Sequence, residues 1–288
     1  MLRLLALTVA LTSACSGVEQ LADVSYDDRF GSSTTMDVYM PAGGGEGRPA
    51  VLMIHGGGWR LFSKAAYAQQ AERLARAGFV AATINYRLVP DGAYPALMQD
   101  SHCALAFLRA HADEYGLDPD RVAVLGYSAG GHMASLLGVA TDVEDFQPDC
   151  AAGSTGPPNG VISGAGPQDL RELHHADAIR ELLGGTIDEV PERYDLASPL
   201  FHVGRTDDVP PYLLIHGSAD LFVPIEQSED MRDALRADGV DARLLNIPAG
   251  GHLLNADGRG DQHLSTSADT PQAWAAQVDF LDRTLGAP

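Results

Sequence analysis

Short apolar runs alternate with longer stretches of helical spacing along most of the chain. The runs have the length of buried strands and occupy residues 50–54, 79–84, 122–125, 160–163, 212–215 and 242–247. Residues 35–40 alternate in polarity and predict a further strand. Apolar positions three or four residues apart predict helices at residues 64–76, 97–111, 130–139, 225–237 and 273–285. Strands that alternate with helices predict an α/β fold with a mainly parallel sheet covered by helices on both faces.

The segment from about residue 141 to residue 209 departs from this pattern. It is rich in Gly, Pro, Asp and Ser, and helical spacing is limited to residues 169–183. We expect loops, one short helix and a small cap there. A chain of 288 residues is long enough to bury one large core, so residues 15–288 are expected to form a single domain.

The first 14 residues have the layout of a signal peptide. Arg3 precedes an apolar run at residues 4–11, and small residues follow. Residues 11–15, Leu-Thr-Ser-Ala-Cys, resemble the bacterial lipobox, although a threonine stands at position 12, where an aliphatic residue is usual. Cleavage before Cys15 would leave this residue to carry a lipid and attach the protein to the membrane; plain secretion is the alternative. In both cases the protein is expected in the bacterial cell envelope or beyond it.

The net charge of the chain bears on which partners it can bind. Nineteen basic residues stand against 39 acidic ones, for a formal net charge of −20. Nucleic acid is therefore not an expected partner, because its phosphates would be repelled. The charge is best explained as an acidic, well-solvated surface.

The three cysteines divide into one candidate lipid carrier, Cys15, and one candidate pair, Cys103 and Cys150. An even pair in an oxidising compartment predicts a disulfide. The alternative is two unrelated buried thiols, since free cysteine is common in protein cores.

The most specific motif is Gly-Tyr-Ser-Ala-Gly at residues 126–130, a G-x-S-x-G sequence with Ser128 at its centre. It lies between a predicted strand and a predicted helix, which is the context of a nucleophile elbow. The glycines on either side of the serine are needed because a Cβ there would collide with neighbouring backbone. The helix that follows brings its N-terminal amides, that of Ala129 first, toward a developing oxyanion.

A second glycine motif, His-Gly-Gly-Gly-Trp, occupies residues 55–59 directly after the predicted strand 50–54. Consecutive glycines allow backbone N–H groups to point at a substrate oxygen. Together with the amide of Ala129, the amides of Gly57 and Gly58 are the expected donors of an oxyanion hole, and Gly56 is a further candidate.

These two motifs resemble those of the hormone-sensitive-lipase-like carboxylesterases of the α/β-hydrolase superfamily, in particular the branch with bacterial feruloyl and acetyl-xylan esterases. The similarity extends from about Met36 to Leu285 and includes residues 115–121, which resemble the family's segment before the elbow strand. The resemblance implies the α/β-hydrolase fold and ester hydrolysis through an acyl-enzyme, with no metal or organic cofactor.

The acid and the base are expected after the serine, in the order Ser, Asp, His. Asp220 opens an Asp-Leu-Phe-Val-Pro loop after the predicted strand 212–215, and in the family the Asp of such a loop is the acid. His252 follows the next strand, where the family has its base. Asp220 would accept from one ring nitrogen of His252, so that the other nitrogen can take the proton of Ser128.

The other histidines have simpler explanations. His132 is expected to pack near the elbow, His216 to support the structure at a strand end, and His263 to lie in a loop. His174 and His175 are expected to be exposed on a helix. The histidines lack the spacing of metal ligands, so no metal site is expected.

The residues therefore predict a serine carboxylic ester hydrolase that acts on small-molecule esters with short acyl groups or of plant-cell-wall type. An amide or peptide hydrolase of the same fold, such as a formamidase or a dipeptidyl-peptidase-like enzyme, is the nearest alternative, because the acyl-enzyme chemistry is shared. A non-catalytic envelope binding protein is a third possibility, which the complete set of Ser128, Asp220, His252 and glycine donors disfavours.

Overall fold

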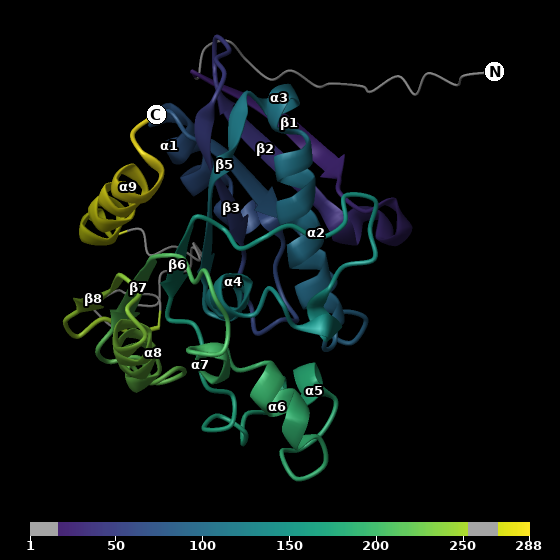
Figure 1. Ribbon diagram of the computed structural model, residues 1–288, viewed down its shortest axis with the longest axis vertical. Coiled ribbons are helices and arrows are strands. Elements are labelled where there is room, and N and C mark those ends of the chain that lie inside the picture. The colour runs from purple at the N-terminus through teal and green to yellow at the C-terminus, as the bar shows by residue number, and fades with distance from the viewer. Residues whose placement is uncertain (1–16, 253–269) are drawn as a thin grey trace.

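The computed structural model describes residues 17–252 and 270–288. Within these residues, eight strands form one sheet in the order β1-β2-β4-β3-β5-β6-β7-β8 (Figure 1). The first three strands of this order pair antiparallel, and all pairs from β4 to β8 are parallel. The strands are β1 (Val18–Ser25), β2 (Thr35–Pro41), β3 (Arg48–Ile54), β4 (Val80–Ile84), β5 (Leu117–Tyr127), β6 (Gly160–Gly164), β7 (Tyr212–Gly217) and β8 (Ala242–Ile247).

Helices cover both faces of the sheet. Helices α1 (Ala68–Arg76) and α9 (Pro271–Leu285) pack on one face, and α2 (Ala96–Ala110), α4 (Ala129–Val139) and α8 (Glu226–Ala237) pack on the other (Figure 1). The remaining helices are short: η1 (Asp28–Thr34), η2 (Lys64–Tyr67), α3 (Ala112–Tyr115), η3 (Glu144–Phe146), α5 (Asp177–Leu183), α6 (Pro191–Leu196) and α7 (Pro199–His202). No helix in the described ranges is long and apolar enough to cross a bilayer.

The central strands are continuous apolar runs because both of their faces are buried. In β3, Leu52 and Ile54 face the core under α2 and α4, whereas Val51 and Met53 face the core under α1 and α9. This arrangement is typical of a parallel sheet with helices on both faces. The predicted α/β class, with a mainly parallel sheet covered by helices on both faces, is confirmed.

The region from residue 141 to 209 differs from the prediction of one helix around residues 169–183. The start of this predicted helix is not helical. The amides of Gln168 and Asp169 both donate to Gln227 Oε1 at 2.8 Å, and the amide of Leu170 donates to Ser198 Oγ at 2.9 Å. Such side-chain acceptors compete with helix formation. Only α5 remains of the predicted helix, and His174 and His175 precede it in an exposed turn.

Two further helices in this region, α6 and α7, were not predicted. Each begins with a proline, Pro191 and Pro199 respectively. Proline breaks a helix from within but suits its first turn, since the missing N–H would have no partner there. The prolines therefore mark helix starts.

Cys103 of α2 and Cys150, which follows η3, are bonded to each other, with 6.2 Å between their Cα atoms. The bridge fastens the segment after η3 to the helix layer. The predicted signal peptide at residues 1–14, the predicted lipidation site Cys15 and the predicted loop residue His263 lie outside the described residues.

Candidate active site

Ser128 lies at the sharp turn between β5 and α4. Its φ of 56° and ψ of −122° place a non-glycine residue in a region that L-amino acids rarely adopt. Neighbouring backbone closes on the turn from both sides: a Cβ on Gly126 would collide with the Gly130 carbonyl, and a Cβ on Gly130 would collide with the Ile54 carbonyl. The two glycines thus allow the tight turn that presents the serine side chain.

A continuous chain of hydrogen bonds runs from Ser128 through His252 to Asp220. His252 Nε2 lies 2.9 Å from Ser128 Oγ, and His252 Nδ1 lies 2.6 Å from Asp220 Oδ2. The three residues come from the carboxyl ends of β5, β7 and β8. The structure therefore brings together the three side chains that the sequence singles out, although residues 129–219 and 221–251 separate them along the chain.

The carboxylate of Asp220 is buried and fully hydrogen-bonded. Its Oδ1 accepts from the amides of Phe222 at 2.8 Å and Val223 at 3.0 Å, and its Oδ2 accepts from His252. Burial alone would raise the pKa of Asp220, but hydrogen bonds from His216, His252 and the Val223 amide outweigh it and hold the pKa well below its ordinary value. Asp220 is therefore ionised at neutral pH, and Nδ1 of His252 is the protonated nitrogen that faces it.

His216 makes a second contact to the same carboxylate. Its Nε2 lies 3.3 Å from Asp220 Oδ2 and 2.9 Å from the carbonyl of Val223, and its Nδ1 lies 2.7 Å from Ser228 Oγ. Both neighbours of Nε2 are acceptors, so Nε2 carries the hydrogen. The sequence analysis expected His216 to support the structure but did not name Asp220 as its partner. The spacing of four residues between His216, at the end of β7, and Asp220 could have indicated this contact.

Two buried aromatic side chains, His55 and Tyr86, hold the glycine loop after β3 by hydrogen bonds to its carbonyl groups. His55 Nδ1 donates to the Gly56 carbonyl at 2.8 Å, and Tyr86 Oη donates to the His55 carbonyl at 2.9 Å. The rings of His55 and Tyr86 stack with centroids 4.4 Å apart. Burial lowers the pKa of His55 to about 4, so its ring is neutral and Nδ1 keeps its proton at neutral pH.

The predicted oxyanion donors lie on the glycine loop and at the first residue of α4, directly after Ser128. A Cβ on Gly56 would lie 2.7 Å from the Tyr127 carbonyl, so the glycine loop approaches the elbow closely. Gly57 and Gly58 have φ values of 107° and 59°, which side chains disfavour. Within the described part of the chain, the amides of Gly57, Gly58 and Ala129 donate no hydrogen bond. They are therefore free to bind a substrate oxygen.

His132 is buried behind the elbow, as the sequence predicts. Its Nε2 donates to the Ala197 carbonyl at 2.7 Å, and burial lowers its pKa to about 4. Its ring meets that of Trp59 edge-on, with centroids 5.3 Å apart. His132 thus connects the glycine loop, the elbow helix and the residue that follows α6.

A cleft of about 750 Å³ opens beside the glycine loop. It is lined by His55, by three residues that follow the glycine loop, by the segment after β4 and by three residues of η1: Arg60, Phe62, Ser63, residues 85–91, Phe30, Ser32 and Ser33. It is not lined by Ser128, Asp220 or His252. A cleft of this size is typical of small-molecule sites.

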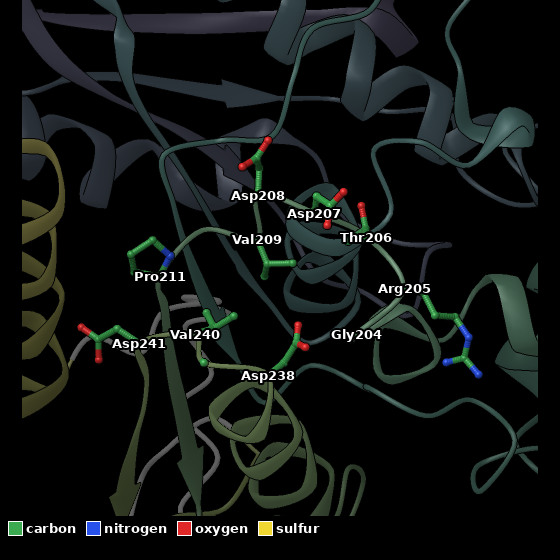
Figure 2. Close-up of a pocket in the computed structure, with 11 residues that line it drawn as sticks. Gly204, Arg205, Thr206, Asp207, Asp208, Val209, Pro211, Asp238, Val240 and Asp241 are labelled. Atoms are coloured by element: carbon green, nitrogen blue, oxygen red, sulfur yellow. The ribbon is translucent and has the colours of Figure 1, made fainter.

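A separate hollow of about 540 Å³ lies between residues 204–211 and 238–241. Figure 2 shows the residues that line it. These segments directly precede β7 and β8, so the hollow lies at the amino ends of these strands, whereas Asp220 and His252 lie at their carboxyl ends. Four aspartates line it, but no group of three or more His, Cys, Asp or Glu in the described ranges could hold a metal. We do not regard this hollow as a functional site.

Comparison with known proteins identifies the family. The BD-FAE family model matches residues 36–235, a range that contains Ser128 and Asp220. Esterase LipC of Mycobacterium tuberculosis is 32% identical over 213 residues, which are 71% of this chain and 52% of that protein. The chain spans about half the length of the curated relatives that it matches.

Solved structures agree over nearly the whole chain. A carbohydrate esterase from gut microbiota superposes with a TM-score of 0.76 and 26% identity, covering 92% of this chain and 95% of that one. The butyrate-bound esterase 2 of Thermogutta terrifontis gives a TM-score of 0.71 and 25% identity, covering 92% and 95%. The resemblance to carboxylesterases that the glycine and serine motifs indicate is thereby confirmed, and the chain belongs to the BD-FAE family of the α/β-hydrolase fold.

Proposed function

We propose that this protein is a serine carboxylic ester hydrolase with Ser128 as nucleophile, His252 as general base and Asp220 as the acid that orients it. The observation that carries the proposal is the position of His252, whose ring nitrogens lie 2.9 Å from Ser128 Oγ and 2.6 Å from Asp220 Oδ2. Esterase names among its relatives and structural neighbours support the same activity.

In the first half of the reaction, Ser128 Oγ attacks the ester carbonyl carbon and its proton passes to His252 Nε2. The negative charge on the carbonyl oxygen is stabilised by the amides of Gly57, Gly58 and Ala129, each donor contributing about 3 kcal/mol to the barrier reduction. The bond to the alcohol oxygen then breaks, His252 returns its proton to that oxygen, and the acyl group stays on Ser128.

In the second half, water replaces the alcohol. His252 Nε2 takes a proton from the water, the hydroxide attacks the acyl carbon, and the same amides stabilise the second oxyanion. Ser128 leaves with the proton from His252, and the carboxylic acid is released. Asp220 stays ionised throughout and stabilises the imidazolium that forms in each half.

We further propose short-acyl or plant-cell-wall-type esters as substrates. The butyrate in the Thermogutta esterase and the carbohydrate esterase among the neighbours support this class. The test is a panel of nitrophenyl esters, acetylated xylan and feruloyl esters, assayed with the wild-type protein and Ser128→Ala. Turnover that is lost in the variant is expected; equal turnover by both proteins would refute the mechanism.

Export remains part of the proposal, with lipid attachment at Cys15. The support is the sequence of residues 1–15. Mass spectrometry of the N-terminal peptide from cells that express the full chain tests it. A lipidated peptide that begins at Cys15 is expected, and an unprocessed Met1 terminus would contradict export.

A further inference from the structure

Exposed apolar side chains gather on the two loops that flank the candidate site. Among the described residues, the large apolar side chains that are exposed are Leu61 (58%), Phe62 (39%), Leu221 (94%) and Phe222 (80%). The first two follow the glycine loop, and the last two follow Asp220 directly. Exposed apolar residues gathered at one place are typical of a binding surface.

Of these four, Phe222 has a ring contact with the proposed base, His252. Its ring lies 5.5 Å from the ring of His252, centroid to centroid, with the planes inclined by 52°. Its backbone is fixed, because its amide donates to Asp220 Oδ1 at 2.8 Å and the next amide donates to the same oxygen at 3.0 Å. The backbone that carries the exposed ring is therefore fixed before any ligand arrives.

The chemistry of the proposed reaction decides which part of the substrate lies there. His252 Nε2 must return its proton to the alcohol oxygen, so that oxygen has to come within about 3 Å of Nε2. The carbonyl oxygen points instead to the amides of Gly57, Gly58 and Ala129. The group that the alcohol oxygen carries therefore starts beside His252 Nε2, next to the ring that Phe222 contacts.

We propose that Phe222 is a specificity-determining residue for the alcohol part of the ester and favours alcohols with an aromatic ring. This inference rests on the proposed function. An aromatic alcohol covers the exposed face of Phe222 and gains a ring–ring contact, which a small aliphatic alcohol cannot make. The acyl group lies on the other side of the carbonyl carbon and does not meet this ring.

Leu221 provides a matched control. It is apolar, lies on the same loop and is more exposed than Phe222, at 94% against 80%, but it has no ring to pair with an aromatic alcohol. The substitution Leu221→Ala removes apolar surface from the loop but keeps the ring of Phe222.

The experiment compares wild type, Phe222→Ala and Leu221→Ala on ethyl, benzyl, phenyl and 1-naphthyl acetate, and on nitrophenyl acetate and butyrate. The readout is the ratio of variant to wild-type kcat/KM for each ester, in which the intrinsic reactivity of the ester cancels. For Phe222→Ala we expect this ratio to be about tenfold lower for naphthyl acetate than for ethyl acetate. It should be equal for nitrophenyl acetate and butyrate, and Leu221→Ala should give similar ratios for all esters.

All acetates form the same acetyl-enzyme, so kcat should converge among them wherever deacylation limits turnover, in the variant as in wild type. A Phe222→Ala ratio that is the same for every alcohol would overturn the inference and assign the ring to holding His252. A ratio that depends on the acyl group would also overturn it. Wild-type turnover of ethyl acetate tests the proposed function separately; if wild type hydrolyses no ester, the function fails and the inference fails with it.

Discussion

His216 Nε2 and His252 Nδ1 share one oxygen of Asp220, at 3.3 Å and 2.6 Å. His216 is completely buried and is fixed by Val223 and Ser228 on its other sides. His216 thus contacts the carboxylate from the buried interior, while His252 contacts the same oxygen from the active site. Asp220 is therefore positioned by a buried neighbour as well as by its own loop.

The first prediction concerns this contact. His216→Leu removes a hydrogen bond to a charged group and leaves Ser228 without its partner, so the free energy of unfolding should fall by about 1–3 kcal/mol. Because the carboxylate that orients His252 is loosened, kcat should fall by about tenfold or more with little change in KM. His216→Gln, which keeps a donor, should recover part of kcat. Steady-state kinetics and urea unfolding are the measurements; a stability loss with unchanged kcat would assign His216 a purely structural role.

Three buried histidines predict a loss of stability in mild acid. Burial lowers the pKa of His55, His102 and His132 to about 4, below the value of about 6.5 in the unfolded chain. The unfolded state therefore binds more protons between these pH values, and the free energy of unfolding should fall as the pH drops from about 6.5 toward 4.

His102 tests this prediction most cleanly, because neither of its ring nitrogens has a hydrogen-bond partner within residues 17–252 and 270–288. His102→Leu should be as stable as wild type or more so at pH 7, and should reduce the acid-dependent loss by up to about 3 kcal/mol. Urea unfolding of both proteins at several pH values is the measurement. An unchanged pH slope in the variant would mean that His102 is not the buried neutral group described above.

The disulfide should stabilise the fold without supporting catalysis. Cys103 and Cys150 are 47 residues apart, and closing a loop of that length in the unfolded chain is worth about 4 kcal/mol in the chain-entropy model. Neither residue contacts Ser128, Asp220 or His252. Cys103→Ala/Cys150→Ala should therefore unfold at a lower urea concentration and keep kcat/KM within about twofold. Equal stability of variant and wild type would contradict the expectation, and so would a large loss of kcat/KM.

The substrate preference should favour short acyl groups. Of the four leucines in the segment between β6 and α6, Leu170, Leu182 and Leu183 are buried in the core and Leu173 is partly buried against it, which leaves too few to line a long acyl channel. Each further buried CH₂ gains up to about 0.8 kcal/mol, but only where apolar wall exists to receive it. We expect kcat/KM to peak at acetyl to butyryl esters and to fall steeply by the octanoyl ester. The check is a series of C2, C4, C8 and C12 nitrophenyl esters below their micelle-forming concentrations, where a maximum at C8 or beyond would indicate a lipase.

The parts of the molecule that follow from local patterns could be predicted from the sequence. The strands from β2 to β8 and the helices around them come from apolar periodicity, and the elbow at Ser128 comes from a turn that only glycine neighbours allow. Asp220 and His252 could be named because the fold fixes their order and their strand ends. Their contact with Ser128 depends on the order of the strands, which places the carboxyl ends of β5, β7 and β8 at the same end of the sheet.

What could not be predicted depends on contacts between distant residues. The non-helical start of the cap results from Gln227 and Ser198, which lie outside that segment and occupy its amides. Strand β1 lies at the sheet edge and is mixed in polarity, so it carries no clear period. The role of Tyr86 depends on its contact with the carbonyl of His55, 31 residues earlier in the chain.

The central claim is that Ser128 is an activated nucleophile. A fluorophosphonate probe tests it most directly, because the serine oxygen must displace fluoride from phosphorus and only an activated serine does so quickly. Peptide mass spectrometry after brief exposure should find one label per chain, on the peptide that contains Ser128. The label should be absent from Ser128→Ala and strongly slowed in His252→Ala, while His132→Ala should react at nearly the wild-type rate. Rapid labelling of another serine, or of the Ser128→Ala protein, would contradict the assignment.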